Sequence, residues 1–76
     1  MAVLLESPWY QQIVREGEVR MARGSIVDAL DARFGEVPSG VAQQVSRITD
    51  LDRLKELLRK AITAETPEEF ARFLAE

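Results

Sequence analysis

The side chains that could do chemistry in this 76-residue chain are carboxylates, hydroxyls, lysines and arginines. There is no cysteine and no histidine, so the chain lacks a thiolate nucleophile, a Cys-based metal site and the usual general base. The glycine-rich stretch "GEVPSG" lacks the Lys-Ser/Thr ending of a nucleotide-binding loop and follows no predicted strand. We therefore expect no enzyme activity, no catalytic residue and no cofactor.

Two pairs of carboxylates are close in sequence. Glu68 and Glu69 are adjacent, but both fall in the first turn of a predicted helix, where the helix dipole favours acidic side chains. Asp28 and Asp31 are three residues apart and could share a helix face as weak metal ligands, but no third ligand lies nearby. We assign both pairs a structural role and expect no metal site.

Three arginines, Arg15, Arg20 and Arg23, could contact phosphate, although Glu16 and Glu18 are interleaved with them. Such mixed charge is more typical of a solvated, salt-bridged helix face. The net charge of −3 also disfavours nucleic-acid binding through this chain alone, because non-specific affinity comes from phosphate neutralisation. Phosphate contacts by the three arginines remain an alternative.

The apolar residues recur with helical spacing almost throughout, and no segment alternates with the period of a strand. The pattern predicts an all-α fold, a long N-terminal helix followed by a compact bundle of three short helices. Ser7 can cap the long helix at Pro8, and Gly35 can end it after Phe34 in a left-handed conformation. Pro38 then delays the next helix.

The three short helices each have an apolar face. The first carries Val41, Val45 and Ile48. The second is capped by Thr49 or Asp50 and has a predicted buried face of Leu51, Leu54, Leu57, Leu58, Ala61 and Ile62. The third begins with a capping box between Thr66 and Glu69 and offers Phe70, Phe73 and Leu74 to the core.

The long helix is too long for a compact domain of this size. Residues 8–34 span roughly 40 Å, whereas the domain would be about 30 Å across, so part of the helix must protrude, bend or pair. Its second half carries the core stripe Ala22, Ile26, Leu30 and Phe34. We therefore predict a helical arm over residues 1–24, serving oligomerisation, and a small helical domain over residues 25–76.

A heptad-like seam follows the arm, since Tyr10, Val14, Gly17, Met21 and Gly24 are spaced by four and three residues. The two glycines would let a second helix approach closely; alternatively they mark a kink or are simply tolerated on an exposed face. We predict self-association, a dimer first of all. The expected interface is Trp9, Tyr10, Ile13, Val14, Gly17, Met21 and Gly24.

The longest uninterrupted apolar run is "AVLL", residues 2–5, which is far shorter than the roughly 20 residues of a membrane span. It also lacks the cationic start of a signal peptide. We expect a cytoplasmic protein without a membrane partner.

The chain resembles the C-terminal tail of bacterial Rpn-type proteins, the recombination-promoting nuclease or putative transposase family. The resemblance begins at Ser7 and rests on three markers and a Leu-rich helix that ends in an acidic-aromatic segment. The markers are the Ser-Pro-aromatic-aromatic-Gln entry (residues 7–11), the Glu16-Gly17 step and the Arg-Phe-Gly-x-x-Pro turn (residues 33–38).

In this family the tail usually follows a nuclease domain, but the chain has no Asp followed by an acidic-x-Lys motif, so no catalytic residue carries over. The resemblance implies a non-catalytic interaction module. Two alternatives follow from it: a standalone regulator that pairs with and inhibits a full-length nuclease, and an accessory nucleic-acid-binding module.

Overall fold

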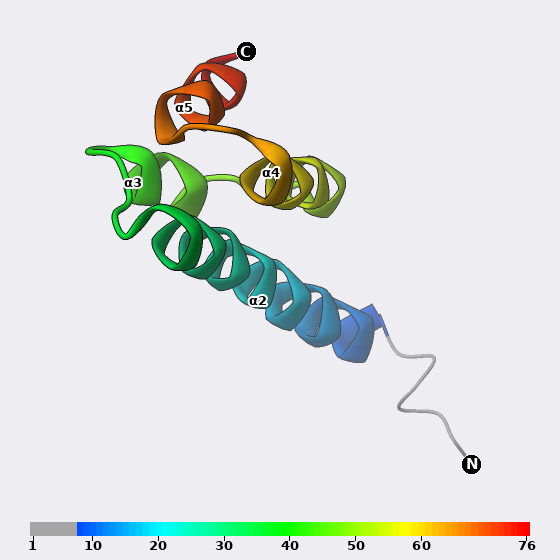
Figure 1. The fold of residues 1–76 in the computed structure, drawn as a ribbon. Helices are drawn as coiled ribbons and strands as arrows, with labels where there is room; N and C mark the ends of the chain where they lie inside the picture. Colours follow the sequence, from blue (N-terminus) through cyan, green and yellow to red (C-terminus); the bar gives the residue numbers. More distant parts are fainter. Residues whose placement is uncertain (1–7) are drawn as a thin grey trace.

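Four helices make up the fold in the computed structural model, which describes residues 8–76, with side chains from residue 11 onward. They are α2 (Pro8–Phe34), α3 (Val41–Ser46), α4 (Leu51–Thr63) and α5 (Pro67–Ala75) (Figure 1). No strand occurs among the described residues. The predicted all-α fold, with one long helix before three short ones, is confirmed.

The long helix α2 protrudes from the rest of the fold. It is uninterrupted from Pro8 to Phe34, and its N-terminal half extends beyond α3, α4 and α5 (Figure 1). The described chain measures 50 × 22 × 18 Å, with a radius of gyration of 14.6 Å, against about 11 Å for a compact domain of this length. The predicted boundary between arm and domain, after residue 24, falls inside this helix.

The helix ends follow their sequence signals. Gly35 has φ 75° and its N–H donates to the Asp31 carbonyl at 2.8 Å, which is the predicted left-handed cap of α2. Asp50, rather than Thr49, caps α4, since its Oδ1 accepts from the Asp52 N–H at 3.1 Å. The predicted cap at Ser7 lies outside the described residues.

The start of α5 departs in one detail from the predicted capping box. The Thr66 hydroxyl accepts from the Glu69 N–H at 3.1 Å, as expected. The Glu69 carboxylate, however, accepts from the N–H of Glu65 at 3.2 Å, one residue before the cap. Its other oxygen lies 2.8 Å from Lys60 Nζ, so Glu69 also ties α5 to the last turn of α4.

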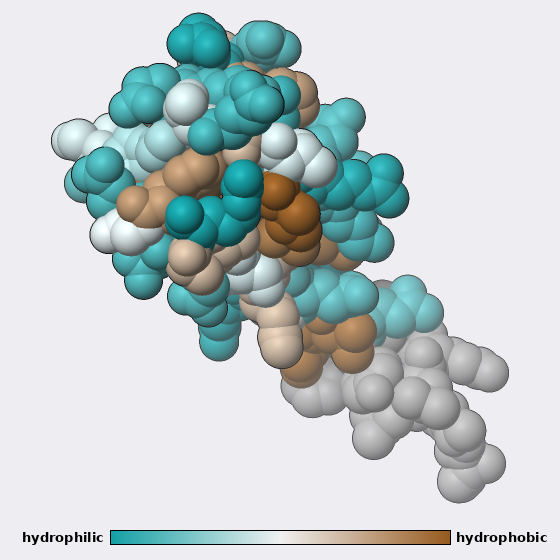
Figure 2. Space-filling model, in the orientation of Figure 1, coloured by the Kyte–Doolittle hydropathy of each residue, from teal (hydrophilic) through white to brown (hydrophobic). Residues whose placement is uncertain are grey.

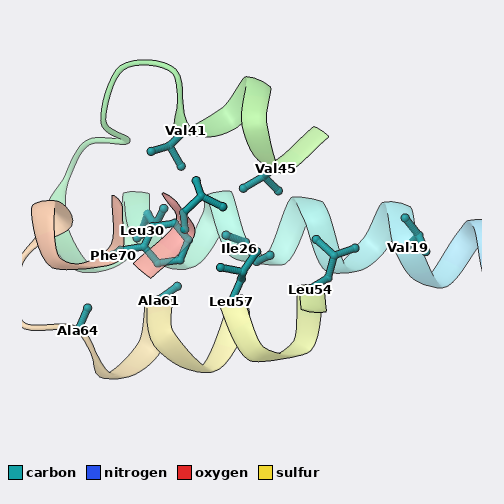
Figure 3. Packing of buried hydrophobic residues seen from close by; sticks show 11 residues of the cluster. Val19, Ile26, Leu30, Val41, Val45, Leu54, Leu57, Ala61, Ala64 and Phe70 are labelled. Atoms are coloured by element: carbon teal, nitrogen blue, oxygen red, sulfur yellow. The ribbon is translucent and has the colours of Figure 1, made fainter. Parts of the chain in front are cut away.

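The core lies mainly between α2 and α4 (Figure 3). Leu54, Leu57 and Ala61 of α4 point toward α2 from one side, and Val41 and Val45 of α3 cover it from another. The fully or almost fully buried hydrophobic residues are Val19, Ile26, Leu30, Val41, Val45, Leu54, Leu57, Ala61, Ala64, Phe70 and Leu74.

Three positions differ from the sequence-based expectation, and one of them is the small residue Ala64, which is fully buried although no predicted apolar face includes it. Ile62, predicted to be buried, is 56% exposed, because Ala61 already faces α2 and the next residue lies about 100° further round the helix. Val19, which we had not assigned to the core, is 7% exposed. It precedes Ile26 by seven residues and so lies on the same face of α2.

Leu57 and Ile62 of α4 differ in burial, so we expect them to differ in their contribution to the free energy of unfolding. Leu57→Ala should lower the free energy of unfolding by about 2 to 5 kcal/mol, because Leu57 is fully buried and the substitution leaves a cavity. Ile62→Ala, the control on the same helix, should stay within about 0.5 kcal/mol. Urea unfolding followed by circular dichroism measures both. Equal losses would contradict the packing described for α4.

The Lys60–Glu69 contact predicts a pH-dependent contribution to stability. The pKa of Glu69 is lowered from its ordinary value of 4.5, first because Lys60 donates a hydrogen bond to the carboxylate and second because the Glu65 N–H does so. A lowered folded-state pKa stabilises the fold above the unfolded-state value, and this contribution is lost as the pH falls through the folded-state value.

Glu69→Gln should therefore unfold more easily than the parent chain at pH 7, and the difference should shrink below pH 4.5. Glu68→Gln is the matched control, since Glu68 lies in the same first turn of α5 but outside this ion pair. Urea midpoints measured from pH 7 to pH 3 give the comparison. A Glu69→Gln effect that did not vary with pH would be inconsistent with the ion pair.

Candidate partner-binding surface

The N-terminal half of α2 carries apolar side chains that the described part of the chain leaves largely exposed. Ile13 is 47% exposed, Val14 43% and Met21 70%. Figure 2 shows hydrophobic surface on this part of the molecule and a second hydrophobic area over α4. The side chains of Trp9 and Tyr10, which complete the predicted interface, lie outside the described residues.

Part of this surface forms a groove between α2 and α4, here called the α2/α4 groove. It has a volume of about 530 Å³ and is open along one side. Its lining residues are Val14, Gly17, Glu18, Met21, Ala22, Ser25, Leu51, Lys55 and Leu58. Three of the seven predicted interface residues, Val14, Gly17 and Met21, thus share one hollow with side chains of α4.

Helical spacing explains why these residues meet. Leu51, Lys55 and Leu58 are four and three residues apart, so they form one row on α4. Leu51 and Leu58 are only partly buried, because their neighbours Leu54 and Leu57 occupy the core. The row therefore borders the groove, and it adds leucines that the sequence-based interface did not include.

The two helical glycines are open to solvent in the single chain. A Cβ atom built at Gly17 or Gly24 would have no neighbour within 4 Å. The continuous α2 helix does not break at either glycine. No described element comes within 4 Å of these Cβ positions, so among the described residues the space at both glycines is open to a helix from another chain.

The charges of the groove are opposite on its two walls. Glu18 lies on the α2 wall and Lys55 on the α4 wall, and both are exposed. The ion pairs formed within the described residues are Arg53–Glu56 and Lys60–Glu69. Glu18 and Lys55 belong to neither, so both are available to a partner.

The three arginines also come together, in a second hollow of about 410 Å³. Its lining residues are Gln12, Arg15, Glu16, Val19, Arg20, Arg23 and Thr49. Arg23 donates two hydrogen bonds to the Ile48 carbonyl, at 3.0 and 2.7 Å. Arg23 thereby fixes the connection between α3 and α4 to α2, a structural role that the sequence did not reveal. Arg15 and Arg20 are exposed.

Two further arginines hold the helices in the same way. Arg33 donates to the Ala61 carbonyl at 2.8 Å, and Arg53 donates to the Phe73 carbonyl at 3.1 Å. The Arg53 guanidinium also lies 5.0 Å from the centre of the Phe73 ring. Both bonds reach a carbonyl in the last turn of a helix, where carbonyls run out of amide partners within the helix. The Phe73 carbonyl also accepts from the N–H of Glu76 at 3.2 Å.

Neither a membrane-spanning helix nor a gathering of three potential metal ligands is found in the part of the chain that the structure describes. The chain matches no protein-family model, no curated protein and no solved structure. The relation to Rpn-type tails therefore remains a prediction from the sequence markers.

The Arg23 hydrogen bonds predict a stability difference between two arginines of the same helix. Arg23→Met should lower the free energy of unfolding by about 1 to 3 kcal/mol, because it leaves the Ile48 carbonyl without its charged donor. Arg20→Met, an exposed position lining the same hollow, should change it by less than about 0.5 kcal/mol. Chemical unfolding at low protein concentration tests this. If Arg20→Met lowered the free energy of unfolding as much as Arg23→Met, the contact with the Ile48 carbonyl would not explain the contribution of Arg23.

Proposed function

We propose that this chain is a non-catalytic helical interaction module that self-associates through α2. The observation that carries the proposal is the exposed apolar surface of the protruding half of α2, where Met21 is 70% exposed beside the α2/α4 groove. Exposed apolar patches next to a hollow usually mark a partner surface.

The energetics favour a dissociable dimer. Burying one large apolar side chain completely contributes about 1.5 to 3 kcal/mol, but Ile13, Val14 and Met21 are already partly covered. A two-fold dimer buries each of them twice. The sum is comparable with the association cost of about 4 to 15 kcal/mol. We therefore expect a dimer that forms and dissociates with concentration rather than an obligate one.

Self-association has more support than phosphate binding. In the arginine-lined hollow, Arg23 already donates to the Ile48 carbonyl, and Glu16 adds negative charge to the same lining. Pairing with the tail of an Rpn-type nuclease would use the same α2 surface and remains a prediction of the sequence resemblance. Co-purification with a tagged full-length relative distinguishes that regulatory role from self-association.

Light scattering during dilution tests the proposal. The parent chain should be dimeric at tens of micromolar and dissociate on dilution. Met21→Glu should shift the chain to monomer, because it places a charge in the apolar groove. Gly17→Leu should also weaken the dimer, because its side chain fills the space that a second helix would enter.

Ile62→Glu is the control for both variants. Ile62 is also exposed, at 56%, but it does not line the groove, so this variant should dimerise like the parent chain. Circular dichroism checks that every variant keeps its helical content. A parent chain that is monomeric at tens of micromolar would refute self-association.

A further inference from the structure

Building on the self-association proposed above, we infer that two copies pair antiparallel through α2, with each Glu18 facing the second copy's Lys55. The two-fold axis crosses the exposed seam at the level of residue 19, between Gly17 and Met21. The occupant of the α2/α4 groove is thus the N-terminal half of α2 from the second copy. Three observations carry this inference: the charges of the groove, the places of the glycines and the position of α4.

A two-fold interface must be complementary to itself, because the same surface meets its own copy. The α2/α4 groove meets this requirement. Its floor is apolar, and it has one acidic and one basic side chain on opposite walls, Glu18 and Lys55. Neither is used in an ion pair within the described residues. Pairing two grooves matches each carboxylate with an ammonium group of the other copy.

The glycines distinguish the two possible helix directions. In a parallel pair, each seam residue meets the same residue of the second copy, so Met21 would meet Met21 and Gly17 would meet Gly17. From Val14 onward, layers that contain two large side chains would then alternate with layers that contain only glycines. In an antiparallel pair about an axis at the level of residue 19, Met21 of each copy meets Gly17 of the other, and Val14 meets Gly24.

This antiparallel arrangement places a larger side chain opposite an open glycine in each of the four layers that Val14, Gly17, Met21 and Gly24 form. Both glycines have the space for it, since a Cβ atom at either would have no neighbour within 4 Å. Met21 and Val14 are exposed and free to enter that space. Large side chains that fill gaps on the facing helix are the general form of close helix packing.

The position of α4 supports the same direction. In each copy α4 packs against α2 from Val19 toward the C-terminus, and leaves the N-terminal half uncovered (Figures 1 and 3). Antiparallel pairing brings each uncovered half beside the other copy's α4, where Leu51 and Leu58 border the groove. Parallel pairing would leave the two uncovered halves beside each other only.

The charges on the two flanks of the pair are then accounted for. On the flank with the α4 helices, two Glu18 carboxylates come together with two Lys55 ammonium groups. On the other flank, Arg20 has Glu16 one turn earlier on its own helix, a spacing and order that favour attraction. Antiparallel pairing also opposes the two helix dipoles favourably.

Disulfide trapping tests the direction, and the chain is suited to it because it has no native cysteine. The Gly17→Cys and Met21→Cys chains are mixed in equal amounts and oxidised with a glutathione redox buffer. A disulfide requires Cα atoms about 4.4 to 6.8 Å apart. Antiparallel pairing therefore predicts that the mixed 17–21 disulfide exceeds both homodimeric disulfides.

The Val14→Cys and Gly24→Cys chains provide a second, independent pair with the same expected outcome. A predominance of 21–21 and 17–17 disulfides would indicate parallel helices and overturn the inference. A statistical mixture would overturn it too, because it would mean no fixed pairing. In either case light scattering could still show a dimer, so self-association would stand while the antiparallel arrangement fell.

A charge exchange tests the Glu18–Lys55 contacts. Glu18→Lys or Lys55→Glu alone should weaken dimerisation by at least about tenfold, because each change converts two attractive contacts of the dimer into repulsive ones. The double exchange should restore the affinity to within about threefold. Salt at about 1 M should reduce the effect of both single variants.

Glu65→Lys is the matched control, because it makes the same charge change at an exposed position between α4 and α5 that lines neither hollow. It should leave the dissociation constant within about threefold of the parent value. If each single exchange lowers the free energy of unfolding of the dilute monomer and the double exchange restores it, Glu18 and Lys55 pair within one chain. The proposed contact between copies would then be wrong. Single variants without effect on dimerisation would also refute it.

Discussion

The fold depends on the packing of α2 against α4. Ile26 and Leu30 of α2 and Leu57 and Ala61 of α4 are fully buried where the two helices meet. The other two helices cover the sides of this contact, α3 through two valines and α5 through Phe70 and Leu74. Because the chain is short, the described residues form a single core, and this contact excludes water from several of its large side chains at once.

The same contact explains the exposed surface. The α4 helix has 13 residues and α2 has 27, so α4 covers only about half the length of its partner. The uncovered half of α2 has no described element against which it could bury its apolar residues. Its exposed side chains, and the groove where α4 ends beside it, thus follow from a mismatch in helix length rather than from a specialised loop or cavity.

Polar contacts fix the orientation of the helices around this core. Arg23, Arg33 and Arg53 each donate to a carbonyl on another element, at Ile48, Ala61 and Phe73. Lys60 pairs with Glu69 between α4 and α5. These four basic side chains therefore hold neighbouring elements in a fixed orientation.

The sequence alone determined the helices, their order and most of their ends, because caps such as Asp50, Thr66 and Gly35 act through neighbouring backbone groups. It also determined that the long helix exceeds a compact domain, which depends only on length and rise per residue. Tertiary structure alone decided that Val19 is buried, that Ile62 is exposed and that Arg23 binds the Ile48 carbonyl. These outcomes depend on which helix faces which and on how far α4 reaches along α2, and helical periodicity within a single segment carries neither kind of information.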